Sequence, residues 1–492
     1  MNSPQAASAQ QFAQQLAEPS GRRRPVAFRN ATVITVDPAL GTLRGCDVLV
    51  TGDSITAVGP SLEVPEGTLE IDASGGILMP GMVDTHRHMW QTALRGYGAD
   101  WSLTNYFYFF YINWGKLFRP QDVYAGNLLA AIESVDAGTT TTLDWSHGLR
   151  TVEHGEAAAD ALDSVPGRFV LGYGNLAGSP WEWANSPDFR AFARRRLDAA
   201  DDMHGFQLAF DITGEPSFPE RGAFEAARDL GVPVTTHSGV WKVTTDDAIR
   251  LMAEHGFLTD QVTHVHCGSL SEDSYQRIAA SGGSASLAPE SECSAGQGYP
   301  PSFTLRKHGI PISLSVDTSV WWNADMFSAM RALLNTDRVH EHLEHHERDD
   351  TCVNLRLRAK DVIEYATIGG AGALRLDRVI GSITPGKKAD LILIQNAASP
   401  VMFPLINPEG HVVYQAGRAD VHTVMVNGRV LKHEHRLLLD DLLAKARSAV
   451  TDTVDYLRAE MGEQAWDADM HPAQPDVELI ANPYQYSEYK RD

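Results

Sequence analysis

The sequence predicts an α/β fold: a (β/α)8 barrel of the TIM type, with a small composite β-sandwich domain built from both ends of the chain. Two observations lead to this prediction. Through the middle of the chain, eight short strand-like runs alternate with longer helical runs, as βα units do. Runs that alternate apolar and polar residues precede this region and return after it, as half-buried strands do.

The strand-like runs of the middle region favour a closed barrel over an open doubly wound sheet, because eight such units are the number that closes. No glycine-rich phosphate-binding motif follows the early runs, which argues against an open nucleotide-binding sheet. The predicted strands cover residues 79–86, 138–145, 168–174, 206–212, 232–237, 262–267, 283–289 and 311–317.

The predicted domain boundaries follow these changes in pattern. Residues 77–384 form the barrel, and residues 26–76 and 385–433 form the composite β-domain. Residues 1–25 are interpreted as a polar tail, because they lack the apolar core of a signal peptide. Residues 434–492 are predicted to contain a helix and an extended arm. The helix has an apolar stripe that suits packing against the barrel or a second subunit: Leu439, Leu443, Ala446, Val450, Val454, Leu457 and Met461.

Composition and charge exclude some classes of partner. The 492 residues are 43% hydrophobic and 21% charged, which is ordinary for a globular protein with a large core. A formal net charge of −22 argues against nucleic acid or an anionic membrane as partner, because phosphates are repelled. The 4 cysteines form no CxxC pair, which favours a reducing compartment, and no apolar run approaches the ~20 residues that span a bilayer. We therefore expect a cytoplasmic protein that acts on a small molecule.

The sharpest chemical signal is the motif His86-Arg87-His88 at the end of the first predicted barrel strand. Residues two apart on a strand point to the same face, so both imidazoles can reach one cation. Neutral imidazole suits Zn²⁺ or Fe²⁺. The motif alone is a weak signal, because two structural histidines with satisfied hydrogen bonds at a strand end would look the same.

Residues at the ends of later strands strengthen the metal interpretation. The carboxyl ends of barrel strands open into one mouth, so residues far apart in sequence are expected to converge there. For one divalent ion, with zinc favoured and Fe²⁺ or Mn²⁺ as alternatives, we predict four protein ligands: His86, His88, His237 and Asp317. Such an ion lowers the pKa of its water toward ~7. Asp317 would also accept a proton from this water, and His266 would steady the nucleophile or the developing oxyanion.

Three longer motifs carry a resemblance to a known family. They are PGMVDTHRHMWQTALRG (80–96), SVDTSVWWNADMFSAMR (315–331) and GSITPGKKADLIL (381–393). The motifs resemble the first strand, the eighth-strand segment and the return into the β-domain of the amidohydrolase superfamily, specifically its branch of atrazine and triazine chlorohydrolases, cytosine and guanine deaminases and S-adenosylhomocysteine deaminase. The resemblance spans about residues 26–433 and implies the barrel, the β-domain, the ligand roles and a homodimer. The run 206–212 has no lysine for a bridging carbamate, which favours a mononuclear centre.

The chain departs from this branch at one position. Deaminases of the branch usually have a glutamate three residues after the fifth-strand histidine, where it shuttles protons, and this chain has Val240 there. Valine cannot move a proton, so the departure argues against simple purine or pyrimidine deamination. Glu292 is the first candidate replacement and Glu290 the second, since both follow the seventh strand at the mouth; the alternative is that both are solvated loop carboxylates.

Aromatic residues near the predicted mouth suit a flat substrate. The run 101–111 is unusually aromatic, although packing of a helix against the core is its simpler interpretation. Flat rings at the mouth would bind an aromatic or heterocyclic molecule. The predicted substrate contacts are Gln91, Trp101, Tyr106, His147 and Trp322.

The sequence therefore predicts a metal-dependent hydrolase in which activated water attacks an electrophilic carbon. The bond broken would be the C–N bond of an amide, an amidine or an aminated heterocycle. One alternative keeps this chemistry but expels a halide, and another is a specialised amidohydrolase of secondary metabolism that needs no ring protonation. The remote alternative, a non-catalytic barrel protein, conflicts with the retention of all four ligand candidates.

Overall fold

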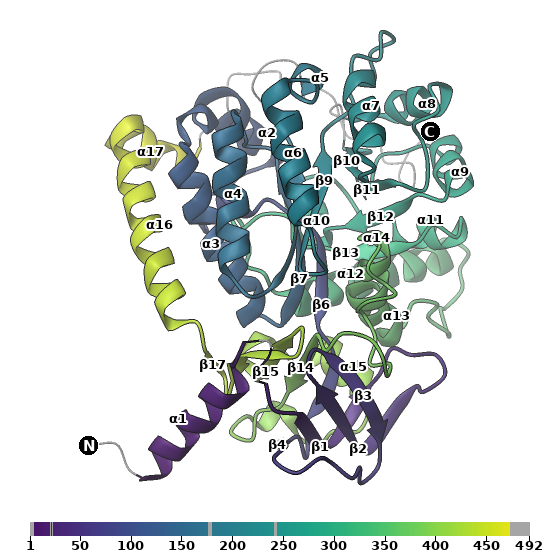
Figure 1. Ribbon diagram of the computed structural model, residues 1–492. Coiled ribbons are helices and arrows are strands. Elements are labelled where there is room, and N and C mark those ends of the chain that lie inside the picture. Colours follow the sequence, from purple (N-terminus) through teal and green to yellow (C-terminus); the bar gives the residue numbers. More distant parts are fainter. Residues whose placement is uncertain (1–3, 20, 22, 176–179, 241–243, 473–492) are drawn as a thin grey trace.

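The computed structural model describes residues 4–19, 21, 23–175, 180–240 and 244–472 (Figure 1). These residues form an eight-stranded parallel barrel and a nine-stranded mixed sheet, and the mixed sheet lies below the barrel in Figure 1. Helices surround the barrel. The predicted fold class is confirmed.

The barrel strands follow one another in sequence order, and each pairs in parallel with the next. The ring is bridged just beyond the last strand, where the N–H of Asp317 donates to the carbonyl of His86 (3.0 Å) and the N–H of His88 donates to the carbonyl of Asp317 (2.7 Å). This bridge therefore lies among the predicted metal ligands. The strands are β6 (Met82–Arg87), β7 (Thr139–Ser146), β8 (Arg168–Tyr173), β9 (His204–Ala209), β10 (Val234–Ser238), β11 (Val262–His266), β12 (Ser284–Leu287) and β13 (Ile312–Leu314).

The first predicted strand, 79–86, is divided between the two sheets. Its beginning belongs to β5 (Ile77–Pro80) of the mixed sheet, and the rest forms β6 of the barrel. Gly81 joins the two strands at a point where a Cβ would lie 2.2 Å from the side chain of Thr140. Only glycine allows the chain to pass this close to β7.

Capping interactions start several helices of the barrel region. In α3, Pro120 occupies the first turn, where its missing N–H costs no hydrogen bond, and the Asp122 carboxylate accepts from the N–H of Arg119 (2.8 Å). The helices are α2 (Leu103–Phe107), α3 (Pro120–Asp136), α4 (Val152–Ser164), α5 (Pro180–Trp183), α6 (Pro187–Ala199), α7 (Arg221–Leu230), α8 (Asp246–Glu254), α9 (Glu272–Ser281), α10 (Pro289–Ser294), α11 (Ser302–Lys307), α12 (Met326–His346), α13 (Ala359–Glu364), α14 (Gly370–Ala373) and α15 (Pro408–Tyr414).

The mixed sheet joins the two ends of the chain. β5 pairs antiparallel with β14, from Ile77 opposite Ile394 to Pro80 opposite Leu391, and this pairing brings residues more than 300 positions apart into one sheet. The sheet has its own apolar core, which includes Phe28, Val48 and Leu78. Its other strands are β1 (Val26–Ile34), β2 (Thr42–Thr51), β3 (Ser54–Gly59), β4 (Leu69–Asp72), β14 (Leu391–Ile394), β15 (Val421–Val426), β16 (Arg429–His433) and β17 (Arg436–Leu437).

Helices flank the two sheets at both ends of the chain. Within the predicted polar tail, residues rich in alanine and glutamine form α1 (Pro4–Leu16), and Leu16 is buried in the core of the mixed sheet. The apolar stripe lies on α16 (Asp440–Met461), which packs along α3 and is followed by α17 (Glu463–Met470). The extended arm predicted for the last 30 residues begins instead as a helix, α17, and its remainder, 473–492, lies outside the described residues. Among the described helices, none combines the length and apolarity that crossing a membrane requires.

Candidate metal centre and pocket

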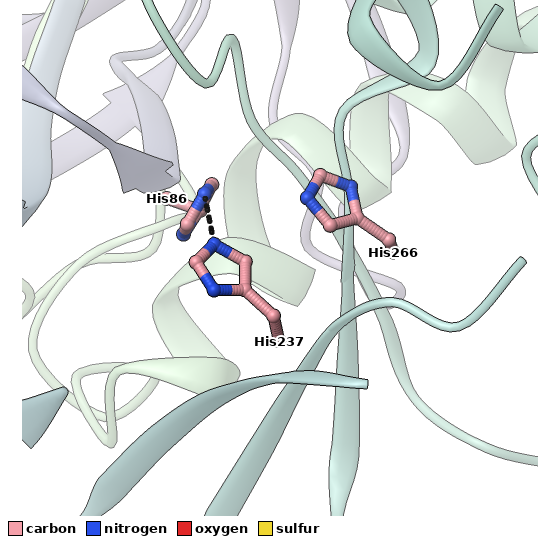
Figure 2. A group of neighbouring side chains, drawn as sticks. All are labelled: His86, His237 and His266. Atoms are coloured by element: carbon pink, nitrogen blue, oxygen red, sulfur yellow. Dashed lines mark hydrogen bonds between the residues drawn. The ribbon is translucent and has the colours of Figure 1, made fainter. Parts of the chain in front are cut away.

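Five residues of the predicted site meet at the carboxyl ends of the barrel strands. His86 lies in β6 and His88 directly follows it, His237 lies in β10, His266 ends β11, and Asp317 follows β13. All five side chains are buried. Figure 2 shows three of these imidazoles gathered from separate strands.

The possible ligand atoms are close together. The Nε2 atoms of His86 and His237 are 3.4 Å apart, and Oδ1 of Asp317 lies 3.5 Å from Nε2 of His86 and 3.4 Å from Nε2 of His88. In each of two sets that share His86, the ligand atoms lie within 4.8 Å of one another; the sets are His86, His237 and His266, and His86, His88 and Asp317. The structure thus brings together the four predicted ligands, and His266 lies beside them.

Hydrogen bonds fix which ring nitrogens face the cluster as acceptors. Nδ1 of His88 donates to the carbonyl of Trp145 (2.8 Å), and Nδ1 of His237 donates to the carboxylate of Asp211 (2.7 Å). Each ring therefore presents an unprotonated Nε2 to the cluster. The unprotonated Nε2 of His88 lies 3.4 Å from an oxygen of the Asp317 carboxylate, which is unfavourable without a cation between them, so this donor set fits a divalent metal.

The electrostatics of the cluster agree with this fit. Burial lowers the pKa of His88 to about 4 and holds the pKa of His86 well below 6.5, so both imidazoles are neutral near pH 7. Burial by itself would raise the pKa of Asp317, but the hydrogen bond with His86 and the nearby imidazoles lower it far below its usual range. Neutral imidazoles and an ionised carboxylate are the forms that bind a cation.

Two residues of the cluster have strained backbone conformations. His266 has φ +74° and Asp317 has φ +61°, both in the left-handed region that non-glycine residues rarely adopt. Each of them lies where a strand gives way to a loop. Such strain persists only where the surroundings over-determine the backbone, and it is common at functional sites.

Arg87 anchors the strand end between the two metal-motif histidines. Its side chain points away from the cluster and is fully buried, where it forms an ion pair with Glu133 of α3 and donates to Ser134 (2.8 Å) and Ser319 (3.0 Å). Arg95 donates to the same Glu133 carboxylate (2.8 Å). Burial by itself would raise the pKa of Glu133, but the two guanidinium groups hold it at about 2.

Glu292 contacts His266 and is not part of the pocket wall. Its carboxylate is completely buried and lies 3.2 Å from Nδ1 of His266, and it accepts from the N–H of Ala288 (2.9 Å). Burial raises the pKa of Glu292, while the hydrogen bond with His266 opposes this rise. Pro289 starts α10 directly after β12, so Glu292 lies in the first turn, beside β11. This arrangement suits a residue that orients His266, not a proton shuttle that touches substrate.

A narrow pocket with a free volume of about 20 Å³ adjoins the cluster. One wall comes from the aromatic segment after β6, and another contains Val240. The polar side of the pocket contains members of the cluster. The lining residues are His88, Leu103, Tyr106, Phe107, Tyr111, Asp211, His237, Val240, His266, Gln297, Asp317 and Trp321.

Three of the predicted substrate contacts form one buried network. Tyr106 lines the pocket, and its hydroxyl accepts from Nε2 of Gln91 (2.7 Å). The Gln91 carbonyl in turn accepts from the hydroxyl of Thr318 (2.6 Å). Nε2 of His147 lies 3.5 Å from the Tyr106 hydroxyl, and its ring packs against His88. Gln91 and His147 therefore fix the position of the Tyr106 hydroxyl.

The two predicted tryptophans do not line this pocket. Trp101 is buried against Phe109, and its Nε1 donates to the carbonyl of Asp469 in α17 (2.6 Å), so the simpler core-packing interpretation describes it better. Trp322 donates to the carbonyl of Val316 and stacks on its neighbour Trp321, which lines the pocket instead. Periodicity could not distinguish adjacent tryptophans in an irregular loop.

Sequence reasoning missed three polar residues of the site. Asp211 follows β9 and orients His237, and an aspartate at the end of a barrel strand was a usable signal. Ser291 donates its hydroxyl to the Asp317 carboxylate, and Gln297 lines the pocket from the loop after α10. Neither of these last two residues has a sequence pattern that marks it: Ser291 lies in the short helix α10, and Gln297 lies in the loop that follows this helix.

Comparison with known proteins identifies the family. A model described as "Amidohydrolase family" matches residues 77–431. The chain belongs to the amidohydrolase family. It is therefore a hydrolase, and the resemblance seen in its motifs is confirmed. The 5-methylthioadenosine/S-adenosylhomocysteine deaminase of Desulfitobacterium hafniense is 30% identical over 80% of this amidohydrolase and 90% of that protein. The 5'-deoxyadenosine deaminase of Methanosarcina mazei is 26% identical over 87% and 98%.

Solved structures share the fold of this amidohydrolase. A zinc-bound adenosine deaminase from Xanthomonas campestris superposes with a TM-score of 0.72 at 22% identity, covering 87% of this chain and 98% of that one. An atrazine chlorohydrolase from Arthrobacter aurescens, complexed with zinc, gives a TM-score of 0.70 at 19% identity, covering 86% and 100%. At these identities the similarity establishes the barrel and the attached sheet.

Proposed function

We propose that this amidohydrolase uses one divalent ion to hydrolyse a C–N bond of a small aminated heterocycle, and that this ion is zinc. The observation that carries the proposal is the convergence of His86, His88, His237 and Asp317 at the floor of an aromatic pocket. Zinc is favoured because three imidazoles and one carboxylate suit it and because both structural neighbours named above bind it. The cytoplasmic location and the homodimer remain predictions of the sequence.

The residues of the site would have separate chemical roles. An ion held by the four ligands would supply a nucleophile at neutral pH by lowering the pKa of water. Two buried groups beside that position would take up a proton: the Asp317 carboxylate, and Nε2 of His266, whose Nδ1 hydrogen points to Glu292. Tyr106 would contact the substrate with its ring, because its hydroxyl already accepts from Gln91 and lies within hydrogen-bond distance of His147.

The aromatic lining of the pocket supports a flat ring as substrate. Tyr106, Tyr111 and Trp321 line it, and Tyr106 stacks with Trp321 at a ring separation of 5.4 Å. Aromatic faces bind planar heterocycles through offset stacking. The relatives named above deaminate adenosine derivatives, which are aminated heterocycles of this kind.

A second candidate function keeps the metal centre and changes the leaving group. Val240 is buried in the pocket wall where a deaminase of the branch would have its proton-shuttling glutamate. A halide needs no proton to leave, and one structural neighbour is an atrazine chlorohydrolase. The same observation supports a specialised amidohydrolase whose substrate needs no ring protonation.

A substrate screen on the metal-loaded enzyme separates these candidates. The panel contains 5'-deoxyadenosine, 5'-methylthioadenosine, aminated and chlorinated triazines, and simple amides and amidines, with released ammonia and halide measured separately. Ammonia release from an aminated ring supports the leading proposal, and halide release supports the second. Hydrolysis of none of these compounds by protein that carries a full equivalent of zinc would contradict both.

We expect Glu292→Gln to lower kcat by about 10- to 100-fold while leaving the bound metal in place, a typical effect for a group that orients a residue at a metal site. The amide keeps the size of the side chain but removes the charge that holds the Nδ1 hydrogen of His266. Steady-state kinetics against pH and metal analysis check this, because loss of orientation at His266 also shifts the pH profile. Glu272→Gln, on the exposed face of α9, is the matched control. An unchanged rate and profile would remove Glu292 from the site.

A further inference from the structure

We infer that Gln297 selects substrates that present an amidine edge, meaning a ring nitrogen beside an exocyclic amino group. The inference deepens the proposed function and rests on it for the identity of the pocket. It is carried by the position of Gln297, the burial of its side chain and the unpaired state of its amide oxygen.

The loop that carries Gln297 is held in place beside the metal cluster. Gly296 (φ +91°) and Gly298 (φ +99°) flank the residue and allow the chain to turn sharply on both sides of it. The Gln297 carbonyl packs against Gly268, two residues after His266, so closely that a Cβ at Gly268 would lie 3.0 Å from it. The side chain therefore enters the pocket from a backbone that is packed against the end of β11.

The amide of Gln297 has no partner within the part of the chain that the structure describes. The residue is only 5% exposed, and its Oε1 is buried without a hydrogen bond. Buried polar atoms are almost always paired, so an unpaired one that lines a ligand pocket indicates that the ligand supplies the partner. The two carboxylates in the same wall are already engaged: Asp211 with His237, and Asp317 with the cluster.

The chemistry of a primary amide fits an amidine edge. In one plane, glutamine presents an acceptor oxygen and a donor nitrogen, and an amidine edge presents the complementary donor amino group and acceptor ring nitrogen. The other lining groups are mainly aromatic or apolar and add stacking. A ring without the amino group would leave Oε1 unpaired in a buried site, and sites built in this way reject such analogues strongly.

The test compares two small probes of the same shape on the zinc-loaded full-length protein. 2-Aminopyridine has the amidine edge, whereas 2-methylpyridine keeps the ring nitrogen and lacks the amino donor. Affinities measured by ligand-observed NMR at pH 8 should favour 2-aminopyridine about tenfold in the wild type, which corresponds to about 1.4 kcal/mol. Gln297→Met should reduce this preference to less than about twofold without changing zinc content or 2-methylpyridine affinity.

Two further variants sharpen the result. Gln261→Met, at an exposed position outside the pocket, should keep the wild-type preference. Gln297→Glu keeps an acceptor for the amino group but places negative charge against the ring nitrogen, so it should give an intermediate preference. A preference that survives in Gln297→Met, no preference in the wild type, or no binding of either probe would overturn the inference. Because the assay measures binding alone, the inference and the proposed hydrolysis can fail separately.

Discussion

Replacing His88 with alanine is expected to remove bound metal and hydrolytic activity together. In the proposed metal centre His88 supplies one of the four ligand atoms, and its ring is held by the Trp145 carbonyl so that Nε2 faces Asp317. Without this nitrogen the site loses both a ligand and the geometry that activates water, and we expect activity to fall by at least about a thousandfold. Elemental analysis should find less than about 0.3 equivalents of transition metal per chain.

The control for this variant is another histidine outside the site. His346 is exposed at the end of α12, so His346→Ala should keep both metal and activity. Full activity in His88→Ala would rule out the proposed mechanism. Activity lost with a full equivalent of metal retained would show that His88 acts on substrate and is not a ligand.

Glu133→Gln is expected to lower the free energy of unfolding by about 3–5 kcal/mol, the usual cost of removing one partner of a buried ion pair. The change leaves the fully buried guanidinium of Arg87 without its counter-charge. Because Arg87 lies between His86 and His88, we expect metal affinity to fall as well. Chemical denaturation of metal-free and metal-loaded protein measures both effects.

Two comparisons show whether burial of the ion pair causes the large loss of unfolding free energy in Glu133→Gln. Glu254→Gln removes a partner from the exposed pair with Arg250 and should cost less than about 1 kcal/mol. The difference between wild type and Glu133→Gln should also depend on pH. The pKa of Glu133 is about 2 in the folded protein and about 4.5 when exposed, so its stabilising effect is complete above pH 4.5 and is lost as the pH falls toward 2. Equal costs for the two variants at neutral pH would contradict this account.

Much of the fold and the metal cluster could be predicted from the sequence, because local patterns determine them. Alternating strand and helix runs indicate parallel βα units, and parallel units bring the carboxyl ends of their strands to one face. Histidines two residues apart on a strand share a face, which is why His86 and His88 could be paired before their surroundings were known. His237 and Asp317 could be added because they end strands.

The tertiary structure alone decided what the loop residues do. Glu292 and Gln297 both follow β12, yet Glu292 contacts His266 outside the pocket whereas Gln297 lines the pocket. Likewise, Trp321 lines the pocket while its neighbour Trp322 bonds to the backbone. Outside regular strands no fixed period relates sequence position to side-chain direction; packing and left-handed backbone turns set that direction, and they depend on residues far away in the chain.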